Sequence, residues 1–268
     1  MNKKIVQLSM FAFVLIALNW ASCTSEPSSE NTSDSTATTA TNESTQSAET
    51  VEAATYFVPA ELPINYGKEN ILADKIYPIG WSNDSKFAYI VEPADEATGF
   101  YFINIIIQDL NNDKILWSFV YDTEDQIENK DLKATWKEQF ELIKSKLDEH
   151  KIVQEKSFIL EKLKFAVDNN NFEVKLTAKK GVSVDFAPME VIEKYTVKIT
   201  SALGQKQIFS KKEESSRMLD AKVLGVFKSP YENKIAVLVA SENFGYEGPP
   251  NVVGITVVGA NLDSGFKK

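Results

Sequence analysis

The sequence predicts a mainly β domain of the α+β class, made of antiparallel blade-like hairpins with one long amphipathic helix packed on the sheet. Short segments rich in β-branched and aromatic residues dominate the chain after residue 55, and clusters of Asn, Asp, Gly and Pro separate them. One segment instead repeats its apolar residues with a helical period. A hydrophobic content of 43% lies near the globular norm, so the chain has enough apolar surface for a core.

Residues 1–22 have the features of a signal peptide. Lys3 and Lys4 supply the positive start, and the apolar run Met10–Leu18 follows them. This run is too short to span a bilayer as a helix, which needs about 20 apolar residues. We therefore expect export from the cytoplasm and removal of this leader.

Cys23 directly follows the small residues Ala21 and Ser22, which is the pattern that a lipoprotein signal peptidase requires. Trp20 and Asn19 depart from the usual consensus before such a cysteine. The alternative is an ordinary cysteine beside a conventional cleavage site. The position and the two small residues favour lipidation of Cys23, which anchors the chain to a membrane without spanning it.

Residues 23–55 are predicted to be a disordered linker that begins with the lipidated cysteine. Ser, Thr, Ala, Asn and Glu dominate this stretch, and such a composition cannot bury enough apolar surface to offset the entropy of ordering. A flexible chain of this length reaches about 30 Å, which holds the following domain clear of lipid headgroups. Residues 56–268 then form a single β-rich secreted domain.

Eight strands are expected in that domain, each short and rich in β-branched or aromatic residues. The segment Asp109–Lys114 lies between two of them as a hairpin turn, because Asn and Asp tolerate the positive φ values that such turns need. The predicted strands are Phe87–Val91, Phe102–Gln108, Ile115–Tyr121, Phe172–Thr177, Val191–Thr200, Lys222–Phe227, Lys234–Ala240 and Val252–Val258.

One amphipathic helix is expected between the third and fourth strands. Its apolar residues recur at spacings of three and four, and Asp131 is positioned to cap its N-terminus. Charged residues occupy the opposite side, so the apolar side should lie against the sheet. The apolar residues are Leu132, Trp136, Phe140, Ile143 and Leu147.

An internal repeat relates Trp81–Val91 to Lys228–Val239. Both segments contain a turn, then a lysine, then a strand with an alanine in it, as in the opening of a β-propeller blade. Two copies cannot close a propeller, so we expect blade-like hairpins within a smaller assembly of sheets.

The chain resembles a family of predicted secreted bacterial proteins of unknown function. The segments that carry the resemblance are Ile79–Tyr89, the amphipathic helix, Ser229–Val239, and the Gly-aromatic-Glu-Gly-Pro motif of Gly245–Pro249. The resemblance implies export and a single domain. It implies no activity, and it assigns no catalytic residue.

Composition narrows the chemistry that the domain can perform. A net charge of −9 argues against nucleic-acid partners, because their affinity comes mainly from Lys and Arg. Cys23 is the only cysteine and His150 the only histidine, so no multi-cysteine metal site and no cofactor is expected. His150 ends the predicted helix, where a histidine is favourable against the helix dipole without any further role.

Two acidic loops with aromatic neighbours remain as a candidate ligand rim. Each loop follows one copy of the internal repeat, so the loops converge if the copies are neighbours in space. The alternative is that the glycines and prolines merely shape a wide turn and the aromatics pack. The candidate rim residues are Asp95, Tyr101, Phe244, Tyr246 and Glu247.

These observations predict a lipid-anchored, extracytoplasmic protein of the bacterial envelope that binds a partner or has a structural role without catalysing a reaction. The expected partners are the membrane, through the anchor, and an envelope protein or polysaccharide. The alternative is a carboxylate-based hydrolase of envelope polysaccharide, which needs two carboxyl groups about 5 to 9.5 Å apart.

Overall fold

The structure is a computed structural model that describes residues 56–96, 99, 101–122, 130–183, 188–212, 217–246 and 248–268. The expected signal peptide, Cys23 and the expected linker lie outside these residues. In the described part of the chain, no helix has the length and apolar character needed to cross a bilayer.

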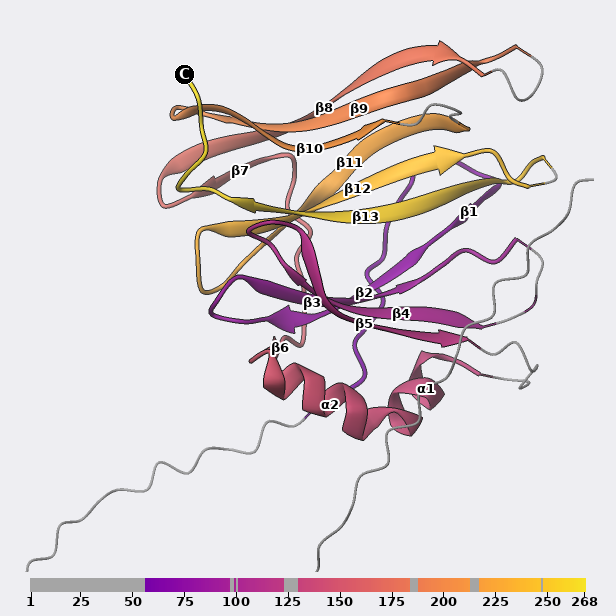
Figure 1. Cartoon of the computed structure of the whole chain (residues 1–268), viewed down its shortest axis with the longest axis vertical. Helices are drawn as coiled ribbons and strands as arrows, with labels where there is room; N and C mark the ends of the chain where they lie inside the picture. Colours follow the sequence, from indigo (N-terminus) through magenta and orange to yellow (C-terminus); the bar gives the residue numbers. More distant parts are fainter. Residues whose placement is uncertain are drawn as a thin grey trace, which may run out of the picture. The chain divides into compact units, whose positions relative to one another are not determined.

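Within the described residues the chain is mainly β and forms three sheets (Figure 1). All neighbouring strands are antiparallel except β1 and β13, which run parallel. The outer sheet has the order β10-β9-β8-β7, with β7 (Lys164–Val167), β8 (Asn170–Val182), β9 (Glu190–Ser201) and β10 (Gly204–Lys212).

The middle sheet has the order β1-β13-β12-β11, with β1 (Ile71–Ala73), β11 (Met218–Lys228), β12 (Lys234–Asn243) and β13 (Asn251–Asn261). The helix-side sheet has the order β5-β4-β3-β2-β6, with β2 (Lys75–Trp81), β3 (Lys86–Glu92), β4 (Phe102–Asp109), β5 (Lys114–Asp122) and β6 (Val153–Gln154).

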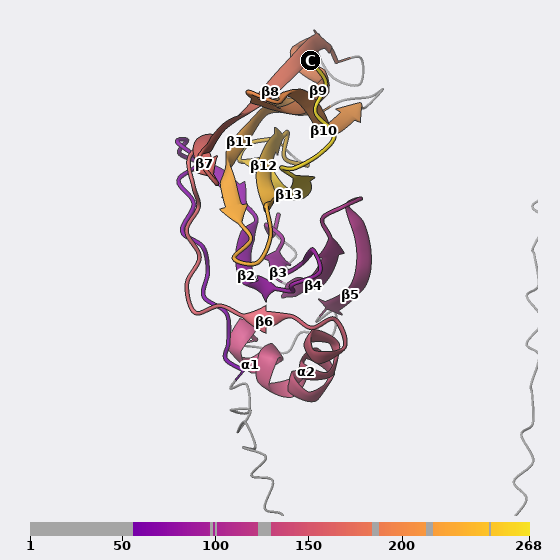
Figure 2. The ribbon, with the colours of Figure 1, turned by 90° about the vertical axis from the view of Figure 1, so that its left-hand side faces the viewer.

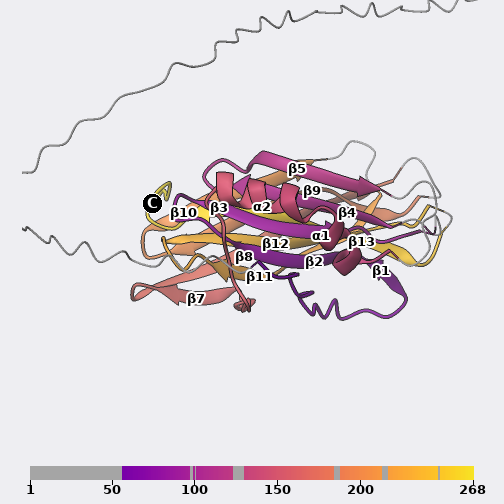
Figure 3. The ribbon, with the colours of Figure 1, turned by 90° about the horizontal axis from the view of Figure 1, so that it is seen from below.

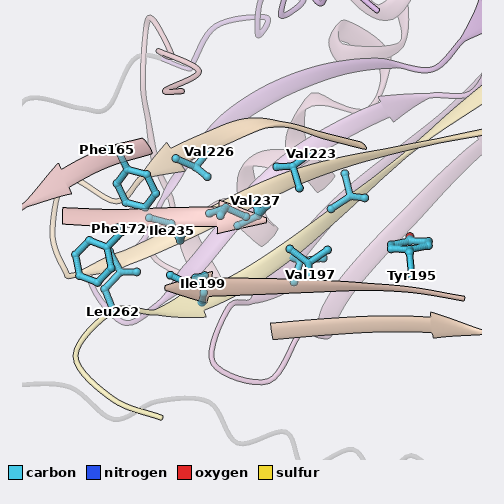
Figure 4. Packing of buried hydrophobic residues seen from close by; sticks show 14 of the residues in the cluster. Phe165, Phe172, Tyr195, Val197, Ile199, Val223, Val226, Ile235, Val237 and Leu262 are labelled. Atoms are coloured by element: carbon cyan, nitrogen blue, oxygen red, sulfur yellow. The ribbon is translucent and has the colours of Figure 1, made fainter. Parts of the chain in front are cut away.

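The sheets stack as layers, and each pair of layers encloses a hydrophobic core. Figure 4 shows the core between the outer and middle sheets, where Phe172 and Ile199 face Ile235 and Val237. A second core lies between the middle and helix-side sheets and contains Phe87, Phe227 and Leu238 among others. A third core lies between the helix-side sheet and the helices.

Strand β12 is buried on both of its faces. Successive side chains of a strand point to opposite faces, so Ile235, Val237 and Val239 pack toward the outer sheet while Ala236 and Leu238 pack toward the helix-side sheet. The corresponding strand β3 likewise divides its side chains between two cores. Both strands therefore read as continuous apolar runs rather than as alternating ones.

The internal repeat corresponds to a structural repeat. Strands β3 and β12 are each the second strand of an antiparallel meander, and the two meanders stack across the core that they share. The turns before the two strands also touch, because Ser85 Oγ donates to Glu232 Oε2 at 2.9 Å and Lys234 donates to Ser85. The expected antiparallel hairpins are therefore present, one in the helix-side sheet and one in the middle sheet, and they contact each other through the shared core and these turns.

The prediction of one long helix is wrong. Helix α1 (Leu132–Glu138) ends at Gln139, where φ is −97° and ψ is 12°, and α2 (Phe140–Glu149) begins after it. The break lets two separate apolar groups reach the twisted sheet, Leu132 with Trp136 from α1 and Ile143 with Leu147 from α2. The N-cap was predicted correctly, since the Asp131 side chain accepts from Ala134 N at 2.8 Å.

The hairpin turn Asp109–Lys114 lies where it was expected, between β4 and β5. Asp113 has a φ of 58°, as an Asn or Asp residue in such a turn tolerates. Its carboxylate also accepts from Gly259 N on β13, so the turn joins the helix-side sheet to the middle sheet.

Five strands were not expected, namely β1, β2, β6, β7 and β10. Pro78 and Gly80 in β2 normally argue against a strand, but the pairing register shifts between them, and a bulge is where a sheet tolerates such residues. Strand β10 alternates Gln and Lys with only a few apolar residues, because it lies at the edge of the outer sheet. It has too few apolar residues for the sequence to predict a strand there.

Replacing Phe87 tests the core between the middle and helix-side sheets. Phe87 is fully buried, and its ring centroid lies 4.4 Å from that of Trp81 and 5.8 Å from that of Phe227. We expect Phe87→Ala to lower the free energy of unfolding by about 3–5 kcal/mol through lost contacts and a cavity, measured by urea denaturation. The control Phe209→Ala, at a half-buried position on β10, should cost clearly less; an equal loss would contradict this packing.

Candidate functional site

The two loops that follow β3 and β12 meet at one end of the molecule. Glu96 Oε1, in the β3–β4 loop, accepts a hydrogen bond from the backbone N–H of Tyr246, in the β12–β13 loop, at 2.6 Å. The loops come together because their parent strands are stacked neighbours. The expectation that the acidic loops converge holds at this contact, although Glu96 was not among the acceptors named from the sequence.

The β12–β13 loop is held in a tight turn from both sides. The Arg217 guanidinium donates to the Gly245 carbonyl oxygen at 2.9 Å. A side chain at Gly245 would collide with the backbone oxygens of Gly248 and Pro250, so glycine is required there. The turn presents Tyr246 to solvent, with 79% of the residue exposed.

The other candidate rim residues have different surroundings. Asp95 precedes Glu96 in the chain and is exposed, and its Oδ2 accepts from Gly99 N at 2.8 Å. Phe244 is half-buried. Tyr101 packs against the core between the helix-side sheet and the helices, so the structure does not bring it to the rim. Glu247, like Cys23, lies outside the described residues.

Asp74, between β1 and β2, joins the first loop to the middle sheet. Its Oδ1 accepts from Ala94 N at 3.0 Å, at the start of the β3–β4 loop. Its Oδ2 accepts from Ile255 N on β13 at 2.9 Å. Burial raises the pKa of this carboxyl above its usual range, and the two N–H groups oppose that rise. No spacing or motif in the sequence marks Asp74.

Lys68, Asp220 and Glu242 form a group of paired charges near the base of the β12–β13 loop, here called the ion cluster. Asp220 on β11 and Glu242 on β12 are directly opposed, and the Lys68 ammonium donates hydrogen bonds to both carboxylates, to that of Asp220 at 3.2 Å. Glu242 is 8% exposed, and it also accepts from Asn251 Nδ2 at 2.8 Å. The hydrogen bonds that Lys68 donates, chiefly the one to Glu242 and also the one to Asp220, raise the pKa of Lys68.

The segment before β1 covers the ion cluster. Lys222 donates to the carbonyl oxygen of Tyr66 and lies 6.0 Å from the centroid of its ring, and the Tyr66 hydroxyl donates to the Asp74 carbonyl oxygen at 2.9 Å. Burial raises the pKa of that hydroxyl. The cavity left between these groups measures about 10 Å³, which is room for roughly one water molecule.

Chemically, the ion cluster is suited to holding the loop end in place. Its lysine lies between the two carboxylates, so neither carboxylate is free of a cation partner. One signal in the sequence could have found Glu242, because it is an acidic residue that continues, at every second position, the row of Ala236, Leu238 and Ala240. Ala236 and Leu238 pack toward the helix-side sheet, and Ala240 lines the small cavity with Glu242. In the described part of the chain, no group of three or more His, Cys, Asp or Glu side chains is arranged to hold a metal ion.

A wider surface hollow of about 430 Å³ lies at the opposite end of β12. The turns β7–β8 and β11–β12 line it, and Asn233 Nδ2 donates there to Asp168 Oδ2 at 2.8 Å. Tyr231, on its wall, is 46% exposed. This second exposed tyrosine is a useful reference for Tyr246.

Comparisons of the chain with protein-family models, with curated proteins and with solved structures found no match. The resemblance to secreted bacterial proteins therefore stays a prediction.

Replacing Asp74 tests how the loop end is held. An amide has one acceptor oxygen, so Asp74→Asn leaves the N–H of Ala94 or of Ile255 facing an NH₂ group. We expect the free energy of unfolding to fall by about 1–3 kcal/mol, the cost of one buried unsatisfied donor. The control Glu141→Gln, exposed on α2, should change it by less than about 0.5 kcal/mol. Equal values for the two variants would show that Asp74 does not hold the loop.

Proposed function

We propose that the chain is an exported bacterial lipoprotein whose β-rich domain binds an envelope polysaccharide or protein through the loop end around Tyr246. The observation that carries this proposal is the contact between the two loops. It holds an exposed aromatic residue against the Glu96 carboxyl group, with the exposed Asp95 next to it in the chain, at the end of the stacked sheets.

The chemistry of this rim favours binding. An exposed tyrosine gives a large rigid face for a sugar ring or an apolar side chain, at a low cost in conformational entropy. The exposed Asp95 carboxylate, next to Glu96 in the same loop, is an acceptor for hydroxyl or amide donors. Because Glu96 and Arg217 fix the backbone of the β12–β13 loop, little order has to be gained on binding.

The anchor and the linker complete the proposal. A lipid on Cys23 keeps the domain at the membrane, and an acidic linker without Lys or Arg lets it reach away from anionic headgroups. A binding domain on such a tether scans the space next to the membrane. The rim and the tether are separate parts of the proposal, and each has its own test.

We expect Cys23→Ser to move the protein from the membrane fraction to the soluble fraction, because the acyl chains have no other attachment point. Fractionation of cells followed by immunoblotting measures this, and intact mass measures the lipid directly. Ser35→Ala, in the same polar tract, is the control and should stay with the membrane. Unchanged partition of Cys23→Ser would refute the anchor.

We expect Tyr246→Ala to weaken binding to isolated envelope polymer by about 10- to 100-fold, the usual loss when an aromatic residue central to an interface is truncated. Co-sedimentation of the purified protein with the polymer, before and after protease treatment of that polymer, measures the affinity and separates polysaccharide from protein partners. Tyr231→Ala is the matched control. The rim is ruled out if both variants bind as the parent chain does.

The same mixtures distinguish the alternative function. A carboxylate-based hydrolase releases soluble fragments from the polymer with time, whereas a binding protein leaves its length unchanged. Release that Glu247→Gln abolishes would support the hydrolase and contradict a purely binding role.

A further inference from the structure

Strand β5 is an open edge of the helix-side sheet. The strand order puts it last, next to β4, and no described residue forms a backbone hydrogen bond with its outer side. Figure 3 shows β5 as the outermost strand beside the helices, and Figure 2 shows the same edge from the side. An open edge presents a row of backbone N–H and C=O groups that can pair with another strand.

The other sheet edges in the described chain are protected. Strands β6, β1 and β7 are two, three and four residues long. Strand β10 carries Lys206, Lys211 and Lys212, and charges on an edge oppose pairing with another strand. On β11 the side chains of Asp220 and Lys222 are bonded to the segment that covers the ion cluster. Strand β5 has none of these three protections, since it is nine residues long, its charges lie only at its two ends, and no described residue bonds to its outer side. Its single bulge, at Leu116, lies near one end and leaves the segment from Trp117 to Tyr121 regular.

Both faces of β5 carry apolar side chains that are not fully buried. On the face toward the helices, Trp117, Phe119 and Tyr121 form a row with centroids 6.3 and 6.4 Å apart, and all three are half-buried. On the other face, Val120 is 63% exposed and Ile115 is 45% exposed. Apolar residues grouped on one exposed edge are typical of an interface.

We propose that β5 pairs antiparallel with β5 of a second copy of this chain, around a two-fold axis at Ser118, so that two helix-side sheets become one. The charges at the strand ends favour this partner. Antiparallel pairing brings Lys114 of one copy to the strand end that carries Asp122 of the second copy, one residue from direct opposition, and symmetry repeats this arrangement at the other end. No ion pair involving Lys114 or Asp122 is seen among the described residues.

The side chains also match across the axis. A two-fold axis perpendicular to a sheet keeps each face on its own side, so Trp117 lies opposite Phe119 of the second copy on the helix face. Leu116 is the extra residue of a bulge, because Trp117 pairs with Ile107 while Ile115 pairs with Gln108. On the other face, Ile115 therefore comes opposite Val120 of the second copy, and the two exposed side chains cover each other.

This interface is independent of the loop rim and of the lipid anchor. A typical stable complex buries about 800 Å² of surface on each partner. Pairing through one nine-residue strand buries a smaller area than that. We therefore expect a concentration-dependent dimer in solution rather than a permanent one. Sedimentation velocity of the full-length chain over a concentration series should show a monomer–dimer equilibrium.

Cross-linking at the axis tests the register. Residues directly opposed in an antiparallel pair have Cα atoms about 4.5–5.5 Å apart, which is within disulfide range. In a full-length chain that carries Cys23→Ser, Ser118→Cys is the only thiol, and mild oxidation should link it to itself in a covalent dimer. The matched control is Ser210→Cys on the lysine-bearing edge β10, which should stay monomeric.

A charge exchange tests the orientation. Lys114→Asp puts charges of the same sign at each end of the pair, and because the register sets Lys114 opposite Tyr121, one residue from Asp122, we expect the dimer dissociation constant to rise about two- to fivefold. The double variant Lys114→Asp with Asp122→Lys restores opposite charges and should restore the parent value. Thermal unfolding of each variant at low concentration checks that the monomer remains folded.

Three results would overturn the proposal. The first is a chain that stays monomeric over the whole series while Ser118→Cys cross-links no better than Ser210→Cys. The second is a dimer whose affinity the double exchange does not restore. The third is cross-linking of Ser118→Cys in cells to a different envelope protein in place of a second copy, which would assign the edge to a heterologous strand.

Discussion

The structure depends on the burial of the middle sheet on both of its faces. Strand β12 sends Val237 into one core and Leu238 into the next, and β11 and β13 likewise contribute side chains to both, so the middle sheet packs against the outer sheet on one face and against the helix-side sheet on the other. A strand buried in this way cannot change register, because a shift by one residue would exchange the side chains of two different cores. The central strands therefore fix where the loops at their own ends begin.

That constraint explains the loop end. Because β3 and β12 occupy equivalent places in stacked meanders, the loops that follow them leave the stack side by side and touch through Glu96 and Tyr246. The carboxylates that come near the core at this end have hydrogen-bond partners. Asp74 accepts from two backbone N–H groups, and Glu242 accepts from Lys68 and Asn251. What remains exposed at the rim is an aromatic ring and carboxyl groups. The same molecule presents its apolar edge elsewhere, along β5.

Much of the fold could be predicted from local pattern. The apolar runs of β3, β4 and β12 and the Asp131 cap were read correctly, because each depends on residues next to one another in the chain. The helix break at Gln139 could not be predicted, because no residue next to Gln139 disfavours a helix. The break depends on how the apolar side chains of α1 and α2 pack against the helix-side sheet. The prediction that Tyr101 lies at the rim was wrong for a related reason. Its side chain packs against the core between the helix-side sheet and the helices, and a local pattern does not show which face of a sheet the helices cover.

By itself, the sequence determined the β-rich class, the repeated hairpin, and the absence of histidine and cysteine clusters, because composition and period are local properties of the chain. Its leader, lipidated cysteine and linker remain expectations from the same kind of pattern. Only the tertiary structure decided that the repeats stack, that Glu96 reaches Tyr246, and that Lys68 lies between Asp220 and Glu242. Those contacts join residues about 150 positions or more apart, and no local preference encodes which distant groups a packed core brings together.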